Sequence, residues 1–371
     1  MDLNKNNFNN IKPPEHGGIP DGLPGIDYNN FMDFSANISP FGVPDGVRAA
    51  LENLSGYVDV YPDPLCRRLR NAIADAENIP PEWILCGNGV SDLIWRIALT
   101  ASREQYNRNQ AALVAAPSFT EYEHALKACG KMAVKRYNLY PESNFYIKPD
   151  FISWITGDVS LIFLCQPNNP TGIPVRMELA YKILNRCRET GARLIWDECF
   201  LPFMDNPENY TLYHTLAAEP NLIILRAFTK LYGMAGVRLG YAICSDVDYL
   251  ERLRQHGPPW SVSYPAQEAG IAALKELNYI SSLRAFVARE RPRMYQELKA
   301  AGLSRVIPGA ANFLLFQSPV ILDDFLRQKN IFLRNCGNFK NLDAFWYRAS
   351  IRTEEENNRL VSAIREAMGR A

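Results

Sequence analysis

The feature that most constrains the fold is an alternation of short apolar, β-rich runs with longer amphipathic runs through the middle of the chain. In residues 177–189, apolar side chains recur at helical spacing, at Leu179, Ile183, Leu184 and Cys187. Strands that alternate with helices usually pair in parallel and are covered on both faces, so the pattern predicts an α/β fold with a mostly parallel sheet. The expected strands cover residues 84–86, 112–115, 161–164, 194–196, 222–225 and 240–243.

The chain is long enough for two domains, because 371 residues exceed what one hydrophobic core usually serves. From about residue 267 the pattern changes to a long helical run, then to strands near 313–316 and 331–333, and then to a terminal helix from Glu354. Residues 13–44 are rich in proline and glycine and predict an arm that packs on a partner subunit or lines the site. The predicted units are an N-terminal arm over 1–44, a large domain over 45–264 and a smaller α+β domain over 265–371.

Composition argues against several classes of protein. Forty basic and forty acidic residues leave no net charge, which does not favour nucleic acid as a partner. The polar residues 1–7 are not followed by the apolar core of a signal peptide, and no apolar stretch approaches membrane-spanning length. The eight cysteines form no C-x-x-C pair of the kind expected in a zinc site. We therefore expect a reduced, soluble, cytoplasmic protein without a metal site.

A candidate catalytic lysine, Lys230, follows the apolar run 223–225, at or just past the end of an expected strand. Open α/β sheets bind ligands at that edge. A lysine at a strand end is on its own usually solvated, but an amine held in a dry pocket can form a Schiff base with an aldehyde cofactor. Arg238 follows eight residues later, within a glycine-rich segment over 233–240.

Three further segments place polar groups at the ends of expected strands. Asp197 ends the run 192–196, where a carboxylate by itself could merely cap a helix, and Asn169 lies in a proline-rich turn. Residues 87–90 lead from a strand into a helix, whose first amide groups can bind a phosphate. As a dinucleotide fingerprint this last segment is weak, because Asp92 occupies the third glycine position.

In order and spacing these segments resemble the fold-type I pyridoxal 5′-phosphate (PLP) enzymes of the aminotransferase class I/II superfamily, over nearly the whole chain. The resemblance implies the PLP-dependent transferase fold and PLP as cofactor. It also implies that Lys230 binds PLP covalently, while Asp197 pairs with the pyridine nitrogen and keeps the ring protonated as an electron sink. The other implied cofactor contacts are the 3′-oxygen for Asn169, the ring face for Phe119, and the phosphate for Gly89, Val90 and Arg238.

Two further cofactor contacts depend on the same resemblance. Family members commonly carry Ser or Thr three residues before the lysine, where this chain has Ala227. We expect Thr229 to supply that hydroxyl, with a PLP affinity below the usual one. Tyr61 matches a tyrosine that reaches across a dimer interface to the phosphate of the neighbouring subunit. The expected active unit is therefore a homodimer.

The cofactor residues do not identify the reaction, because PLP enzymes of one fold transaminate, decarboxylate or eliminate. His16-Gly17-Gly18, ahead of residues 33–40, resembles the start of the L-threonine-O-3-phosphate decarboxylases of cobalamin biosynthesis. Residues 259–263 resemble the decarboxylase segment that enters the small domain. Phe200 stands where aminotransferases usually carry a tyrosine that hydrogen-bonds the 3′-oxygen. These features favour decarboxylation.

A substrate with both a carboxylate and a phosphate needs two anion-binding groups. Arg352 matches the family arginine that binds a substrate carboxylate, for which a planar bidentate donor is suited. Arg334 would supply a second guanidinium, and the sequence leaves open which arginine binds which anion. The further substrate contacts expected from the resemblance are His16, Ser35 and Asn37.

The sequence thus predicts decarboxylation of L-threonine O-3-phosphate to (R)-1-amino-2-propanol O-phosphate. Phosphoserine stays open as the substrate, because a pocket discriminates one methyl group only modestly. A histidinol-phosphate-type aminotransferase is the nearest alternative, since it shares the cofactor residues. Two alternatives belong to other classes of protein. One is a nucleotide-dependent dehydrogenase whose nucleotide site is formed by residues 87–89, and it would have no visible chromophore. The other is a non-catalytic regulator with this fold.

Overall fold

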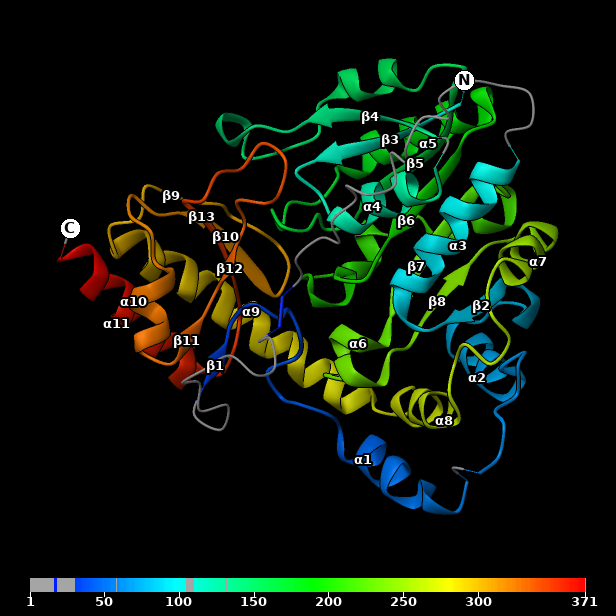
Figure 1. Ribbon diagram of the computed structural model, residues 1–371, viewed down its shortest axis with the longest axis horizontal. Helices are drawn as coiled ribbons and strands as arrows, with labels where there is room; N and C mark the ends of the chain where they lie inside the picture. Colours follow the sequence, from blue (N-terminus) through cyan, green and yellow to red (C-terminus); the bar gives the residue numbers. More distant parts are fainter. Residues whose placement is uncertain (1–16, 19–30, 58, 105–109, 131, 371) are drawn as a thin grey trace, which may run out of the picture.

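The computed structural model describes residues 17–18, 31–57, 59–104, 110–130 and 132–370. Its largest sheet has seven strands in the order β2-β8-β7-β6-β5-β3-β4 (Figure 1). Neighbouring strands run parallel except at β8, which is antiparallel to both β2 and β7. The mostly parallel α/β sheet predicted from the sequence is confirmed. Its strands are β2 (Ile84–Gly87), β3 (Ala111–Ala116), β4 (Ala133–Asn138), β5 (Val159–Cys165), β6 (Arg193–Asp197), β7 (Leu222–Ala227) and β8 (Gly240–Ile243).

All six expected strands are present, and β4 is an additional strand that the sequence did not reveal. It lies at the edge of the sheet and contains Lys135 and Arg136, so it lacks the continuous apolar run of a buried parallel strand. Helices α3, α4 and α5 pack against the sheet. The helices up to residue 273 are α1 (Asp45–Glu52), α2 (Arg67–Glu77), α3 (Gly89–Arg103), α4 (Thr120–Ala128), α5 (Met177–Thr190), α6 (Phe228–Leu231), α7 (Val247–Gln255) and α8 (Tyr264–Ala273).

The C-terminal part of the chain forms a second, antiparallel sheet in the order β12-β13-β10-β9. Strand β1 from the N-terminal segment pairs in parallel with β11, so the segment before α1 lies beside the C-terminal part of the chain (Figure 1). None of the helices in the described residues is long and apolar enough to cross a membrane. The elements of this part are β1 (Met32–Asp33), α9 (Leu277–Ala300), β9 (Arg305–Val306), β10 (Phe313–Gln317), α10 (Asp323–Gln328), β11 (Ile331–Phe332), β12 (Arg334–Asn335), β13 (Trp346–Ser350) and α11 (Glu354–Met368).

Two buried apolar clusters stabilise the two sheets, and helix α9 belongs to both. Its first half contributes Leu283 and Val287 to the cluster around the seven-stranded sheet, and its second half contributes Met294 and Leu298 to the other. Phe34 of the N-terminal segment is also buried in the second cluster. The segment around Phe34 therefore packs on the C-terminal part, whereas the arm and the domain limits at residues 44 and 264 stay predictions.

The loop after β5 is fixed against the C-terminal part of the chain. Gly172 has a φ of +71°, and a Cβ at this position would lie 2.9 Å from the Cα atom of Gly309. The amide of Ala310 also donates to the Gly172 carbonyl at 2.7 Å. This close backbone approach requires glycine and fixes the loop that carries Asn169.

We expect Gly172→Ala to destabilise the protein by more than the roughly 1–2 kcal/mol of a left-handed alanine, because the added methyl group also overlaps Gly309. Gly191→Ala is the matched control, since Gly191 has a φ of +75° but no atom within 4 Å of the position that the methyl group would take. Urea unfolding of both variants measures the difference. Equal losses of unfolding free energy would contradict the proposed close approach.

Candidate active site

A cavity of about 510 Å³ lies at the carboxyl ends of β6 and β7, facing the N-terminal segment and strands β12 and β13. This is the edge at which open α/β sheets bind ligands. It brings together most of the residues singled out in the sequence. The predicted site residues in its wall are Ser35, Asn37, Val90, Phe119, Asn169, Asp197, Thr229, Lys230, Arg238 and Arg334.

Lys230 lies in the short helix α6, directly after β7. Its backbone is held in place because its carbonyl accepts a hydrogen bond of 2.9 Å from the Ser39 amide. Burial, helped by the charges of Arg348 and Arg238, lowers the pKa of the Lys230 amine to about 8. Near neutral pH a much larger fraction of this amine is therefore neutral than for an ordinary lysine, and the neutral amine is the form that reacts with an aldehyde.

Asp197 ends β6, beside the lysine, and is only 3 % exposed. Its Oδ1 atom accepts a hydrogen bond of 3.0 Å from the Cys199 amide, and its Oδ2 atom accepts one of 2.5 Å from the Tyr122 hydroxyl. Burial raises the pKa of the Asp197 carboxyl, whereas these hydrogen bonds and the charge of Lys230 lower it. Tyr122 lies three residues after Phe119 and was not among the site residues expected from the sequence.

The predicted phosphate contacts gather at the first turn of α3. Gly89 has a φ of +75°, and a Cβ there would lie 2.7 Å from an amino nitrogen of Arg238. On β8, a Cβ at Gly240 would lie 2.9 Å from the amide nitrogen of Val90. The guanidinium of Arg238 therefore lies against a helix N-terminus whose amide groups favour an anion. Thr229 adds a hydroxyl side chain to the same cavity.

Two arginines face each other across antiparallel strands in the cavity wall. Arg334 on β12 is the register partner of Arg348 on β13, and both line the cavity. Arg348 donates to Asn169 Oδ1 at 2.5 Å and to the Ser35 carbonyl at 2.7 Å. Burial lowers the pKa of Arg348 to about 10, and no carboxylate among the described residues forms an ion pair with it. A buried cation in this arrangement is suited to an anionic ligand.

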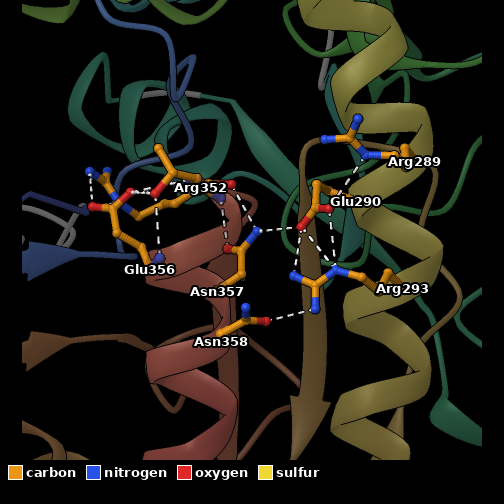
Figure 2. A network of polar contacts seen from close by, with 8 residues as sticks. Arg289, Glu290, Arg293, Arg352, Glu356, Asn357 and Asn358 are labelled. Atoms are coloured by element: carbon orange, nitrogen blue, oxygen red, sulfur yellow. Dashed lines mark hydrogen bonds and ion pairs between the residues drawn. The ribbon is translucent and has the colours of Figure 1, made fainter.

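The structure corrects the prediction for Arg352, which does not line the cavity. Figure 2 shows its side chain in a polar network between α9 and α11. Its guanidinium forms an ion pair of 2.7 Å with Glu356 and donates to the Asp33 carbonyl at 3.0 Å. Arg352 follows the end of β13 and turns away, whereas Arg348 lies within the strand and points into the cavity. Of these two arginines, Arg348 therefore lines the cavity and Arg352 does not.

The N-terminal segment closes the cavity above Ser35. The Gly18 amide donates to Ser35 Oγ at 2.7 Å, and a Cβ at Gly17 would overlap the Ser35 carbonyl oxygen. His16, the third predicted member of this motif, lies outside the described residues. Tyr61 is 77 % exposed and does not line the cavity. Its ring packs on that of Trp260, with the two ring centroids 4.8 Å apart. Its contact with a partner subunit stays a prediction.

Several buried polar atoms of the cavity wall have no partner among the described residues. They are both side-chain amide atoms of Asn37, which is 2 % exposed, and Nε of Arg348. Buried polar groups are normally hydrogen-bonded, so these atoms point to a polar ligand. Together with Lys230 and Asp197, they fit a cofactor that carries an aldehyde and a phosphate, and a substrate that carries an anion. The described residues contain no cluster of His, Cys, Asp and Glu side chains able to hold a metal ion.

Comparison with known proteins agrees with this geometry. The model of the aminotransferase class I and II family matches residues 29–364. The threonine-phosphate decarboxylase of Salmonella typhimurium is 33 % identical over 93 % of both chains. Histidinol-phosphate aminotransferase 2 of Archaeoglobus fulgidus is 30 % identical over 96 % of this chain and 98 % of its own. The crystal structure of the histidinol-phosphate aminotransferase from Clostridium acetobutylicum has a TM-score of 0.84 and 29 % identity, over 92 % of this chain and 100 % of that one.

The protein belongs to the aminotransferase class I and II family. It is a PLP-dependent enzyme of that superfamily, and PLP is its cofactor. Relatives with two different activities match it at similar identity, so the family does not by itself choose the reaction.

The two arginines give a direct test of the corrected anion site. In a Lys230→Ala background, which prevents turnover, we expect Arg348→Gln to weaken the binding of O-phospho-L-threonine by about tenfold or more, because a charged hydrogen-bond donor is lost. Arg352→Gln is the matched control and should change this affinity by less than about twofold, since Arg352 does not line the cavity and its guanidinium already bonds Glu356 and the Asp33 carbonyl. Calorimetric titration measures the affinity of both variants. Equal losses of affinity would show that Arg352 also contributes to binding.

A second test concerns the Lys230 amine in the cofactor-free protein. Its pKa, lowered to about 8, means that the folded protein loses the ammonium proton near pH 8, well below the pH at which an ordinary lysine does. Covalent capture of PLP at Lys230 should therefore accelerate as the pH rises to about 8 and then level off. Borohydride reduction followed by peptide mapping measures it, with Lys230→Ala as the blank. A rise that continues to about pH 10 would contradict the lowered pKa.

Proposed function

We propose that the enzyme decarboxylates L-threonine O-3-phosphate to (R)-1-amino-2-propanol O-phosphate. The observation that carries this proposal is the pair of facing arginines, Arg334 and Arg348, in one cavity with the lysine. Two guanidinium groups suit a substrate that has a carboxylate at one end and a phosphate at the other. The 33 % identity to a threonine-phosphate decarboxylase supports the same substrate.

Within this proposal the two arginines have different tasks. Arg348 contacts Asn169, whose counterpart in the family contacts the cofactor ring, so Arg348 is the arginine nearer the reacting carbon. It would bind the α-carboxylate and orient it for loss as carbon dioxide. Arg334, which also donates to Asn338 at 2.8 Å, would bind the phosphate, with Ser35 and Asn37 offering further polar atoms. The structure thereby suggests an answer that the sequence left open.

Bound PLP supplies the electron sink that accepts the electron pair left at Cα when carbon dioxide departs. The protein's own groups then deliver a proton and exclude water. The Lys230 amine, with its pKa near 8, can hold a proton and deliver it to Cα. Asp197 stays beside it as a buried, hydrogen-bonded carboxylate. The aromatic side chains of Phe119, Phe200 and Phe339 line the cavity and exclude water from the reacting centre.

A histidinol-phosphate-type aminotransferase is the second candidate, because relatives with that name match over nearly the whole chain. Phe200 favours the decarboxylase. Its ring lines the cavity, is 4 % exposed and packs edge-on against Phe313 with the ring centroids 5.1 Å apart. It offers no hydroxyl to the 3′-oxygen of the cofactor. Gly17 and Gly18, which close over Ser35, are the second feature that matches the decarboxylases. The homodimer, the cytoplasmic location and the role in cobalamin biosynthesis belong to this proposal.

The purified, PLP-loaded enzyme should release carbon dioxide from L-threonine O-3-phosphate and form the phosphorylated amino alcohol. Parallel assays with O-phosphoserine and with histidinol phosphate plus 2-oxoglutarate separate the alternatives. We expect release from phosphoserine to be slower by roughly tenfold, the effect of one methyl group, and no transamination of histidinol phosphate. Lys230→Ala is the blank. Transamination without release of carbon dioxide would overturn the proposed function.

A further inference from the structure

Tyr122 is a buried titratable residue to which neither the cofactor contacts nor the proposed reaction assigns a role. It lies in the first turn of α4 and is 1 % exposed. Its hydroxyl donates a hydrogen bond of 2.5 Å to Oδ2 of Asp197. Since the Cys199 amide occupies Oδ1, both carboxylate oxygens are held by protein donors. A carboxylate has about four lone-pair sites, so room remains for a further donor.

We propose that Tyr122 is a positioning residue that holds the Asp197 carboxylate ionised and aimed at the ring nitrogen of PLP. The inference is independent of the proposed substrate, because transamination and decarboxylation both need the protonated ring. It requires only that PLP is the cofactor and that Asp197 faces its nitrogen.

The surroundings explain why the carboxylate needs such a donor. Asp197 is buried, and burial by itself favours the neutral carboxylic acid. A hydroxyl donor stabilises the ionised form instead, since charge-assisted hydrogen bonds are the stronger kind. The proton stays on the tyrosine, because burial and the Asp197 charge raise the pKa of Tyr122 well above its ordinary value. The phenol therefore keeps its proton and donates it in the hydrogen bond to the carboxylate.

The ring of Tyr122 is fixed by packing that does not involve its hydroxyl. It stacks on Phe163 of β5 with the centroids 4.8 Å apart and the planes at 15°. It also meets Phe119 edge-on at 5.4 Å and 86°. Phe119 is the residue expected to cover the cofactor ring, so the N-cap and first turn of α4 supply the stacking aromatic and the donor to Asp197. Phenylalanine at position 122 would keep this packing and lose one hydroxyl.

Tyr122→Phe tests the inference on the full-length protein. We expect the dissociation constant for PLP, measured by titrating the cofactor-free protein, to rise by roughly tenfold or more, the effect of one charge-assisted hydrogen bond. The absorption band of bound PLP should also shift, because the protonation of the ring changes. Tyr137→Phe is the matched control, since the Tyr137 hydroxyl donates to Asp150 at 2.6 Å and Tyr137 does not line the cavity. It should leave both readouts unchanged.

The double variant with Asp197→Asn shows whether Tyr122 acts through the carboxylate. If it does, Tyr122→Phe adds less than about twofold to the loss of PLP affinity already caused by Asp197→Asn, because coupled residues are not additive. Full additivity of the two losses would overturn the inference. So would an unchanged PLP affinity and absorption band in Tyr122→Phe, or an equal weakening by Tyr137→Phe. None of these outcomes depends on which substrate the enzyme uses.

Discussion

The parallel register of β5, β6 and β7 is the constraint on which the rest of the site depends. Cys165 at the end of β5 lies opposite Asp197 at the end of β6, and Asp197 in turn lies opposite Leu225 near the end of β7. Because parallel strands present their carboxyl ends at one edge, the residues that follow them converge there. This one register therefore brings three groups to the same edge of the sheet: the loop with Asn169 after β5, the carboxylate of Asp197 at the end of β6, and the helix with Lys230 after β7.

The second sheet completes the site by a different rule. Its antiparallel pairing sets Arg334 directly opposite Arg348, which places two cations on one face, an arrangement that is unfavourable for like charges. The parallel pairing of β1 with β11 brings Ser35 and the glycines of the N-terminal segment over the same face. The C-terminal sheet and the arm thus carry the residues proposed to bind the substrate, while the seven-stranded sheet carries the residues expected to bind the cofactor. Helix α9, buried in both apolar clusters, connects the two parts.

The sequence predicted the expected strands, the terminal helix and most cavity residues, and its errors have identifiable causes. Edge strand β4 was missed because half of its side chains are polar. Arg352 was predicted as the substrate arginine, and Arg348, four residues earlier, was not considered. The informative signal was that Arg348 lies inside a run with apolar neighbours on both sides, where an unpaired charge is costly unless a ligand uses it. Tyr122 gave no local signal, since an aromatic residue in a helix is usually core.

The sequence by itself determined the strand–helix alternation, the position of Lys230 at a strand end and the cofactor class, because these follow from short patterns and from chain direction. Only the tertiary structure decided which arginine faces the cavity and that Tyr122 bonds Asp197. The reason is physical: Tyr122 and Asp197 are 75 residues apart, and Arg348 meets Asn169 across 179 residues. Contacts over such separations depend on strand pairing and side-chain direction, which no local stretch of residues specifies.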